Sequence, residues 1–271
     1  MLRCSIARLS LVLVLLGTTS LTDVRAAEPA AGSVAERLAK TRTDLKSDDV
    51  AIRRAAIGSL VHSDLSTMMA AEMQAMLTDR DGDVRAVAAT ATGNLGIAAL
   101  PAIPQLTKQL KSDPQKEARE TAARALGRIG KAAPKDRSMV EPLTVAAKED
   151  ADPVTRVVAL GALAMIDVAL ADQILALRKF LHHDEALVRM KASHALGMIG
   201  LPAKAAAPEI VKVLELETDH HRLGYVARAL GNTGDPTSLD ALYAALKKET
   251  DAGAQGEIRG AINRLGGKLP K

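Results

Sequence analysis

The segment "VRMKASHALGMIG" at residues 188–200 has the same pattern as "ARETAARALGRIG" at residues 118–130. In each, an apolar residue precedes an arginine, two variable residues and an alanine follow, and the segment ends in Leu-Gly-x-Ile-Gly. A pattern that returns after about seventy residues is typical of internal repetition, which is the first property to look for in a chain of this length. The arginine therefore serves as a register mark along the sequence.

This register mark recurs throughout the chain. It falls at Arg53, Arg85, Arg119, Arg156 and Arg189, then at Leu223 (beside Arg222) and at Gln255, with spacings of 32 to 37 residues. Seven units in series would cover nearly the whole sequence. The first, sixth and seventh depart most from the pattern, as terminal units of a repeat array often do because they cap it.

Each unit predicts two helices. In the third unit, residues 101–112 place apolar side chains on one face of a first helix. Residues 115–130 form a second, alanine-rich helix with one apolar stripe. We expect Asp113-Pro114 to open this second helix as N-cap and first-turn proline, and Gly130 to end it.

The composition favours an all-helical protein. Hydrophobic residues make up 48% of the 271 residues, yet there are one Phe, two Tyr and no Trp. Ala, Leu, Val, Ile and Met must therefore fill the core, and Ala and Leu are strong helix formers. Alternating β-branched and polar runs are scarce, which argues against strands.

The N-terminus is typical of an export signal. Arg3 and Arg8 accompany an apolar run at residues 9–16, too short to span a bilayer, and residues 24–26 offer a cleavage site. We expect an exported protein, periplasmic or secreted, with no membrane span after cleavage. Removal of residues 1–26 takes away three arginines, one aspartate and Cys4, the single cysteine, so the formal charge falls from +4 to +2. That charge is too small to indicate a nucleic-acid partner.

The units resemble HEAT repeats of the PBS-lyase-like type, whose pattern is a loop Asp, then Val-Arg, Ala-Ala and Ala-Leu-Gly-x-Ile-Gly. The resemblance rests on "DRDGDVRAVAATATGNLG" (79–96), "DPQKEARETAARALGRIG" (113–130), "DADPVTRVVALGALAMI" (150–166) and "HDEALVRMKASHALGMIG" (183–200). It implies a right-handed α-solenoid, an α-α superhelix of about seven helix pairs, because stacked units bury a stripe that no unit buries alone. The boundaries we expect are a signal peptide at 1–26, a flexible leader at 27–33, the solenoid at 34–267 and a tail at 268–271.

The resemblance also gives the recurring Arg and Asp a structural role. Asp79, Asp113 and Asp150 each lie six residues before a register arginine. In similar repeats such residues form a ladder that links one unit to the next, and the planar guanidinium suits carboxylates and carbonyls together. A catalyst is needed once, whereas this pair recurs.

Enzymatic relatives of such repeats carry features that this chain lacks. Deoxyhypusine hydroxylase uses His-Glu pairs to hold iron, and this sequence contains no His-Glu dipeptide. Bilin lyases act inside photosynthetic cells, where an exported protein is poorly placed, and HEAT-like glycosylases stack bases on aromatic side chains. No phosphate loop, Gly-x-Ser-x-Gly elbow or His-Glu-x-x-His occurs. We therefore expect no enzyme activity and no cofactor.

Two histidine-rich turns offer an alternative function in metal binding. "HHDE" at 182–185 and "TDHH" at 218–221 fall between the helices of units five and six, on one edge of the solenoid. Histidine and aspartate suit zinc, nickel or copper. The candidate ligands are His182, His183, Asp184, Asp219, His220 and His221. The alternative for both turns is an ordinary solvated loop.

The main functional prediction concerns the solvent face of the second helices, which line the concave surface in similar folds. Positions five and nine after the register mark give a row of basic character with methionines in its middle, and flexible methionine suits adaptable interfaces. The candidate partner-binding residues are Arg124, Arg128, Met165, His194, Met198, Tyr225, Arg228 and Asn232. We expect a scaffold that binds an acidic or extended protein segment, the alternatives being the metal site or a structural module with no discrete site.

Overall fold

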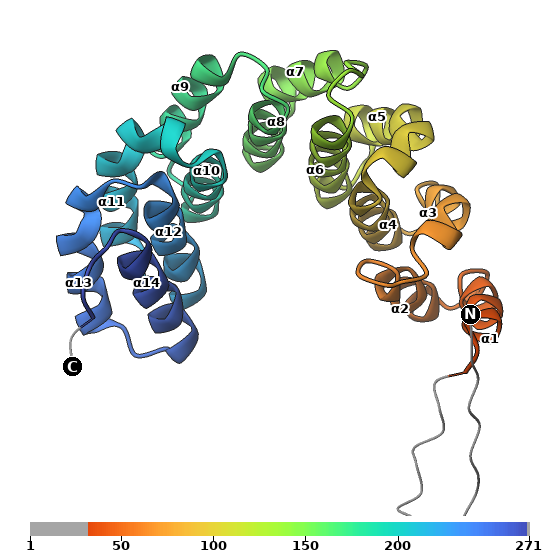
Figure 1. Cartoon of the computed structure of the whole chain (residues 1–271). Coiled ribbons are helices and arrows are strands. Elements are labelled where there is room, and N and C mark those ends of the chain that lie inside the picture. The colour runs from red at the N-terminus through yellow and green to blue at the C-terminus, as the bar shows by residue number, and fades with distance from the viewer. Residues whose placement is uncertain (1–31, 270–271) are drawn as a thin grey trace, which may run out of the picture.

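The computed structural model describes residues 32–269, and within this range it contains helices and no strand. Fourteen α-helices form seven consecutive pairs that follow one another around an arch (Figure 1). The all-α solenoid of about seven pairs is therefore confirmed. The expected signal peptide and most of the leader lie outside the described residues, and the first helix begins at Val34.

One helix of each pair lies on the outside of the arch and the other on the inside (Figure 1). The outer helices are α1 (Val34–Asp44), α3 (Ala70–Met76), α5 (Ile103–Ser112), α7 (Val140–Glu149), α9 (Leu170–Phe180), α11 (Ala207–Leu216) and α13 (Leu239–Lys248). The inner helices are α2 (Val50–Ser59), α4 (Gly82–Asn94), α6 (Lys116–Ala132), α8 (Pro153–Met165), α10 (Ala186–Ile199), α12 (His220–Thr233) and α14 (Ala252–Arg264). The expectation that the second helix of each unit lines the concave face is met.

The bounds of α6 differ from the prediction. Asp113-Pro114 does not open this helix, because the Asp113 carboxylate accepts a hydrogen bond from the Gln115 amide and closes the preceding turn instead. Gly130 does not end it either: it is buried within the helix, where a Cβ would lie 2.5 Å from the Ile166 side chain. In α8, by contrast, an Asp-Pro pair does open the helix, since Asp152 caps it and Pro153 is its first residue.

Glycine sets the distance between most neighbouring inner helices. Eight residues after the register mark, α4, α6, α10 and α12 each carry a glycine against an alanine of the next inner helix. A Cβ on any of these glycines would lie 2.6 to 2.7 Å from the facing alanine, closer than side chains approach. The pairs are Gly93–Ala125, Gly127–Ala162, Gly197–Ala229 and Gly231–Ala261. The helices of these interfaces therefore pack backbone against backbone.

The interface between α8 and α10 is built differently. At the register where its neighbours carry glycine, α8 has Ala164, so this interface lacks the close glycine–alanine contact. The nearby Gly161 has one neighbour, an Ala195 carbon 3.4 Å from its would-be Cβ, which is an ordinary contact. The buried core divides within α8 into two clusters, one from Leu45 to Ile166 and one from Val154 to Ile262, and residues of α8 belong to both.

The hydropathy of the helices adds one negative finding. Among residues 32–269, no helix combines the length and the apolar character needed to cross a membrane.

Candidate functional site

The turn between the helices of a unit is closed in the same way in all seven units. The residue six positions before the register mark accepts a hydrogen bond from the backbone amide two residues later, at 2.7 to 3.2 Å. The acceptors are Ser47, Asp79, Asp113, Asp150, His183, Glu217 and Glu249. In five units the register residue also donates to the carbonyl oxygen of this acceptor.

The predicted ladder between units is present in the first half of the arch. Arg53 donates through Nε and Nη2 to both carboxylate oxygens of Asp79, at 2.8 and 2.9 Å. The same bidentate bond joins Arg85 to Asp113 and Arg119 to Asp150. Hydrogen bonding to these carboxylates raises the pKa of each arginine further above its ordinary value. These residues join units, which confirms their structural role.

The ladder stops at unit four. Arg156 would reach the acceptor of unit five, but that residue is His183, whose Nδ1 already accepts from the Glu185 amide. Its other ring nitrogen then carries the proton and offers Arg156 no acceptor. Arg156 instead lies over the Phe180 ring at 5.6 Å, and its buried Nε has no partner among the described residues.

The two histidine-rich turns do not form the metal site that we considered. They lie on one edge as expected, but no three His, Cys, Asp or Glu side chains within residues 32–269 are grouped to hold a metal ion. His183 closes its own turn, and His220 pairs with Glu249 at 2.7 Å. The remaining candidates are His182, Asp184, Asp219 and His221, and they do not come together as a set of ligands. Asp219 caps α12, and the ring of His221 packs against Tyr225 at 5.0 Å.

The predicted partner-binding residues all lie on inner helices. Arg124 and Arg128 are on α6, Met165 on α8, His194 and Met198 on α10, and Tyr225, Arg228 and Asn232 on α12. Three of them already have hydrogen-bond partners: Arg128 bonds to Asn94 at 2.5 Å, Asn232 accepts from Arg264 at 3.4 Å, and Arg228 donates to Glu257 at 3.4 Å. The others surround the middle of the concave face.

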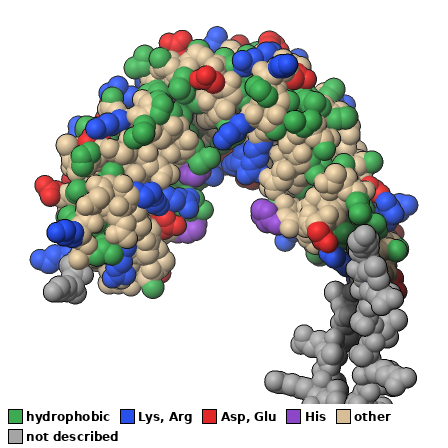
Figure 2. Space-filling view, in the orientation of Figure 1, with side chains coloured by type: hydrophobic (Ala, Val, Ile, Leu, Met, Phe, Trp, Pro, Cys, Tyr) green, Lys and Arg blue, Asp and Glu red, His purple; other side chains and the backbone are tan. Residues whose placement is uncertain are grey.

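A cluster of charges occupies this middle, and two of its members were missed from the sequence. Glu120 and Arg124 of α6 and Lys191 and His194 of α10 act on one another electrostatically. They face each other across α8, where Gly161 occupies the equivalent register and has no side chain to stand between them. We call Glu120, Arg124, Lys191 and His194 the central cluster. Figure 2 shows basic side chains gathered on the inner surface beneath the top of the arch.

Burial shifts the pKa of every group in the central cluster. Burial lowers the pKa of Arg124 and of Lys191 and raises that of Glu120. Burial, with the charges of Arg228, Lys191 and Arg124, lowers the pKa of His194 to about 4, so its imidazole is neutral at pH 7. At neutral pH two cations therefore face a single carboxylate in a partly desolvated place.

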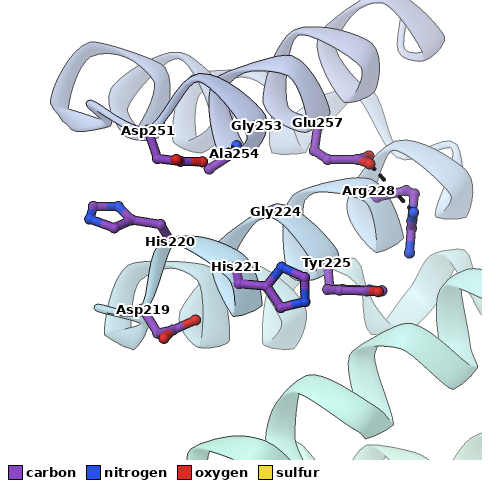
Figure 3. A pocket seen from close by; sticks show the side chains of 10 residues that line it. All are labelled: Asp219, His220, His221, Gly224, Tyr225, Arg228, Asp251, Gly253, Ala254 and Glu257. Carbon is purple, nitrogen blue, oxygen red and sulfur yellow. Dashed lines mark hydrogen bonds and ion pairs between the residues drawn. The ribbon is translucent and has the colours of Figure 1, made fainter.

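A groove of about 500 Å³ continues the concave face between α12 and α14 (Figure 3). Its floor is open because Gly224 and Gly253 line it. Tyr225 is its aromatic wall, with the Arg228 guanidinium 4.5 Å from the ring centre. Glu257 accepts from Arg228 at 3.4 Å, so this end of the face is closer to neutral than the central cluster.

A second, smaller pocket opens between α8 and α10, with a volume of about 160 Å³. Seven residues line it, and one of them, Lys131, is charged. The others are Gly161, Ala164, Met165, Leu170, Met198 and Ile199. Met198 is 60% exposed although it is a large apolar residue. The predicted pair Met165 and Met198 thus comes together in one pocket.

Comparison with protein families agrees with this architecture. Residues 69–138 and 140–224, together more than half of the chain, match HEAT repeats. The chain belongs to the HEAT-repeat family. Residues 223–248 match the PBS lyase HEAT-like repeat. A comparison with curated proteins gives no match.

Two solved HEAT-type structures share the fold. One is a chain of the complex of CpcE and CpcF of phycocyanin lyase from Nostoc sp. PCC7120, with 20% identity and a TM-score of 0.55 over 91% of this chain and 100% of that one. The other is from the Kap95:Nup1 complex, with 12% identity and a TM-score of 0.53 over 85% of this chain and 36% of that one. Identities this low show a common solenoid fold and nothing about activity.

Proposed function

We propose that this HEAT-repeat protein is an exported scaffold without catalytic activity, and that it binds an extended acidic segment of a partner protein along its concave face. One observation carries the proposal. Arg124 and Lys191 are half-buried on the inner surface, and the one opposite charge that acts on both is Glu120. The register arginines Arg53, Arg85 and Arg119, by contrast, are each neutralised by a bidentate hydrogen bond to an aspartate.

An anion from a partner would compensate the excess positive charge of Arg124 and Lys191. A cation removed from water loses solvation, and the loss is offset only when hydrogen bonds and opposite charge replace the water. The central cluster holds more positive than negative charge, and neutral His194 adds a hydrogen-bonding group without a further charge. A carboxylate of the partner is a matching ligand, because charge-assisted hydrogen bonds to carboxylates are short and strong.

The length of the face favours an extended segment. The inner helices α6, α8, α10 and α12 follow one another, and packed helices lie about 8–10 Å apart. Crossing three such steps takes about eight residues of extended chain, at about 3.3 Å per residue. A solenoid presents such a continuous surface because its units stack in one direction.

The protonation state of the central histidine supports a binding role over acid–base chemistry. A general acid or base works best when its pKa lies near the working pH. The pKa of His194, at about 4, lies well below neutrality. We assign no catalytic residue to the concave face.

The test uses the mature chain, residues 27–271, crosslinked in the envelope fraction of its own source. The double variant Arg124→Glu/Lys191→Glu reverses the charge of the central cluster. We expect it to lose the captured partner, while a matched control, Lys108→Glu/Lys212→Glu, changes the net charge equally on exposed positions of the outer helices and retains it. Capture that is equal in both variants would contradict the proposal.

Export is tested separately. We expect the protein from the envelope or the medium to begin at Ala27, as read by mass spectrometry of its N-terminal peptide. A cytoplasmic chain that keeps residues 1–26 would contradict export and leave the binding proposal in place.

A further inference from the structure

We infer that the pocket between α8 and α10 receives one large apolar side chain of the bound segment, and that this side chain lies within about three residues of the acidic residue held by the central cluster. The inference rests on the proposed function and adds the side-chain preference of the site. The observation behind it is the interface between α8 and α10, which differs from the interfaces on either side of it.

The pocket lies at an interface that lacks the close glycine–alanine contact of the interfaces on either side of it. Gly93, Gly127, Gly197 and Gly231 bring the other described inner helices from α4 onward into backbone contact, and in α8 the same register holds Ala164. The absence of a side chain at Gly161 then leaves the space on the concave floor unfilled. The result is a pocket of mixed lining, in which Met165, Met198 and Leu170 supply apolar surface and Lys131 supplies a charge.

The size of the pocket limits its occupant. Small-molecule and cofactor sites usually have volumes of about 300–1,000 Å³. At about 160 Å³ this pocket is too small for such a ligand. It is large enough for one side chain of the size of Leu, Met or Phe, and Met165 and Met198 in its wall can adjust to different shapes.

The position of the pocket couples it to the charges. Gly161, at its rim, occupies the same register on α8 as Arg124 on α6 and His194 on α10. An acidic side chain at the central cluster and an apolar side chain in the pocket are thus about one helix spacing apart, 8–10 Å. That distance corresponds to about three residues of an extended chain. Figure 2 shows apolar and basic side chains next to each other on this part of the inner surface.

The charges of the central cluster and the pocket beside it together decide which kind of segment fits. An uncharged apolar segment would leave Arg124 and Lys191 desolvated and unpaired, which is unfavourable. A purely acidic segment would leave Met198 and the pocket exposed to water. A segment with both an acid and a neighbouring apolar residue satisfies both features.

The experiment uses two synthetic, fluorescein-labelled decapeptides as probes. The first contains Glu, Ser and Gly alone, and the second differs by a single Leu placed three residues from a Glu. We expect the mature protein to bind the Leu peptide about tenfold more tightly in fluorescence anisotropy, as burial of one Leu side chain predicts.

Two glycine variants test whether the pocket provides this preference. Gly161→Leu fills the pocket, and we expect it to reduce the tenfold preference to near unity. Gly58→Leu is the matched control, because Gly58 has the same register on α2 and a side chain there meets nothing within 4 Å. It should keep the preference. Thermal unfolding of both variants verifies that they fold.

The outcomes separate this inference from the proposed function. Equal affinity of the wild type for both peptides, or a preference that survives Gly161→Leu, would overturn the pocket assignment. If Arg124→Glu/Lys191→Glu still loses both peptides in that case, binding at the central cluster stands. If the wild type binds neither peptide, both the pocket and the acidic-segment proposal fail.

Discussion

The two halves of the arch close their turns alike but join their units differently. On α2, α4 and α6, the register arginine closes its own turn and also binds the carboxylate of the next unit. From α8 onward the turn acceptor is still present in every unit, as His183, Glu217 and Glu249. However, Arg222 of the same unit holds Glu217, and His220 takes the place of arginine at Glu249. Turn closure is thus required in every described unit, whereas the link between units varies.

The largest difference should appear when the register arginines are removed. Arg119→Ala leaves the buried Asp150 carboxylate without its bidentate partner, and we expect a loss of about 3 kcal/mol in unfolding free energy. Arg156→Ala removes a contact with the Phe180 ring and should cost about 1 kcal/mol. Urea denaturation of both variants provides the comparison. Equal losses would show that the ladder is not what distinguishes the halves.

The second prediction concerns the spacing of the inner helices. Gly127→Ala places a Cβ 2.7 Å from that of Ala162, and we expect the strain to lower the unfolding free energy by about 2 kcal/mol. Gly161→Ala meets its neighbour at an ordinary distance and should stabilise by about 0.5 kcal/mol, since alanine is the better helix former. Thermal melts of the pair measure both effects. A destabilising Gly161→Ala would mean that α8 and α10 pack as tightly as the rest.

The third prediction repairs the broken ladder. His183→Asp gives unit five the carboxylate found in units two to four, so Arg156 gains a partner while the turn keeps its acceptor. We expect a stabilisation of about 1 kcal/mol in urea denaturation. His182→Asp, at the exposed neighbouring position, adds the same charge and should change little. A gain in both variants would indicate a general charge effect.

The smallest effect depends on pH. Hydrogen bonding to Glu249 raises the pKa of His220 above its ordinary value of 6.5. The stability contributed by this pair is therefore complete below pH 6.5 and is lost as pH rises through the raised pKa. We expect His220→Gln to lower the melting temperature slightly at pH 6 and not at pH 9. The effect of Arg119→Ala should be the same at both pH values, and a constant effect of His220→Gln would contradict the pairing.

Repetition made most of the fold predictable from the sequence. A residue type that returns at one register reports the same environment each time, which is why the helix pairs, the ladder and the concave row could be placed. The presence of Ala164 in place of glycine was also readable in that register and identifies the interface that lacks the close glycine–alanine contact. The bounds of α6 were wrong because Asp113 resembles an N-cap locally, and its use in the ladder depends on the preceding unit.

The candidate site was predictable in part. The rows five and nine after the register mark gave Arg124, His194 and Met198, because they follow a regular helical spacing. Glu120 and Lys191 lie one and two residues after the mark, and their charges act on each other across α8. Such convergence depends on the curvature of the array, which no single unit encodes. The histidine turns were grouped by sequence, whereas His183 is used within its own turn and His220 pairs with Glu249 of the next turn.

The interface between α8 and α10 also has a mechanical consequence. Units of a solenoid touch their neighbours alone, so a pull on the two ends of the arch passes through each interface in turn. At this interface the bidentate ladder and the glycine contact are both interrupted, and the buried core divides into its two clusters within the adjoining α8. Under tension the arch would therefore open first at its middle, while the helix pairs on either side stay packed.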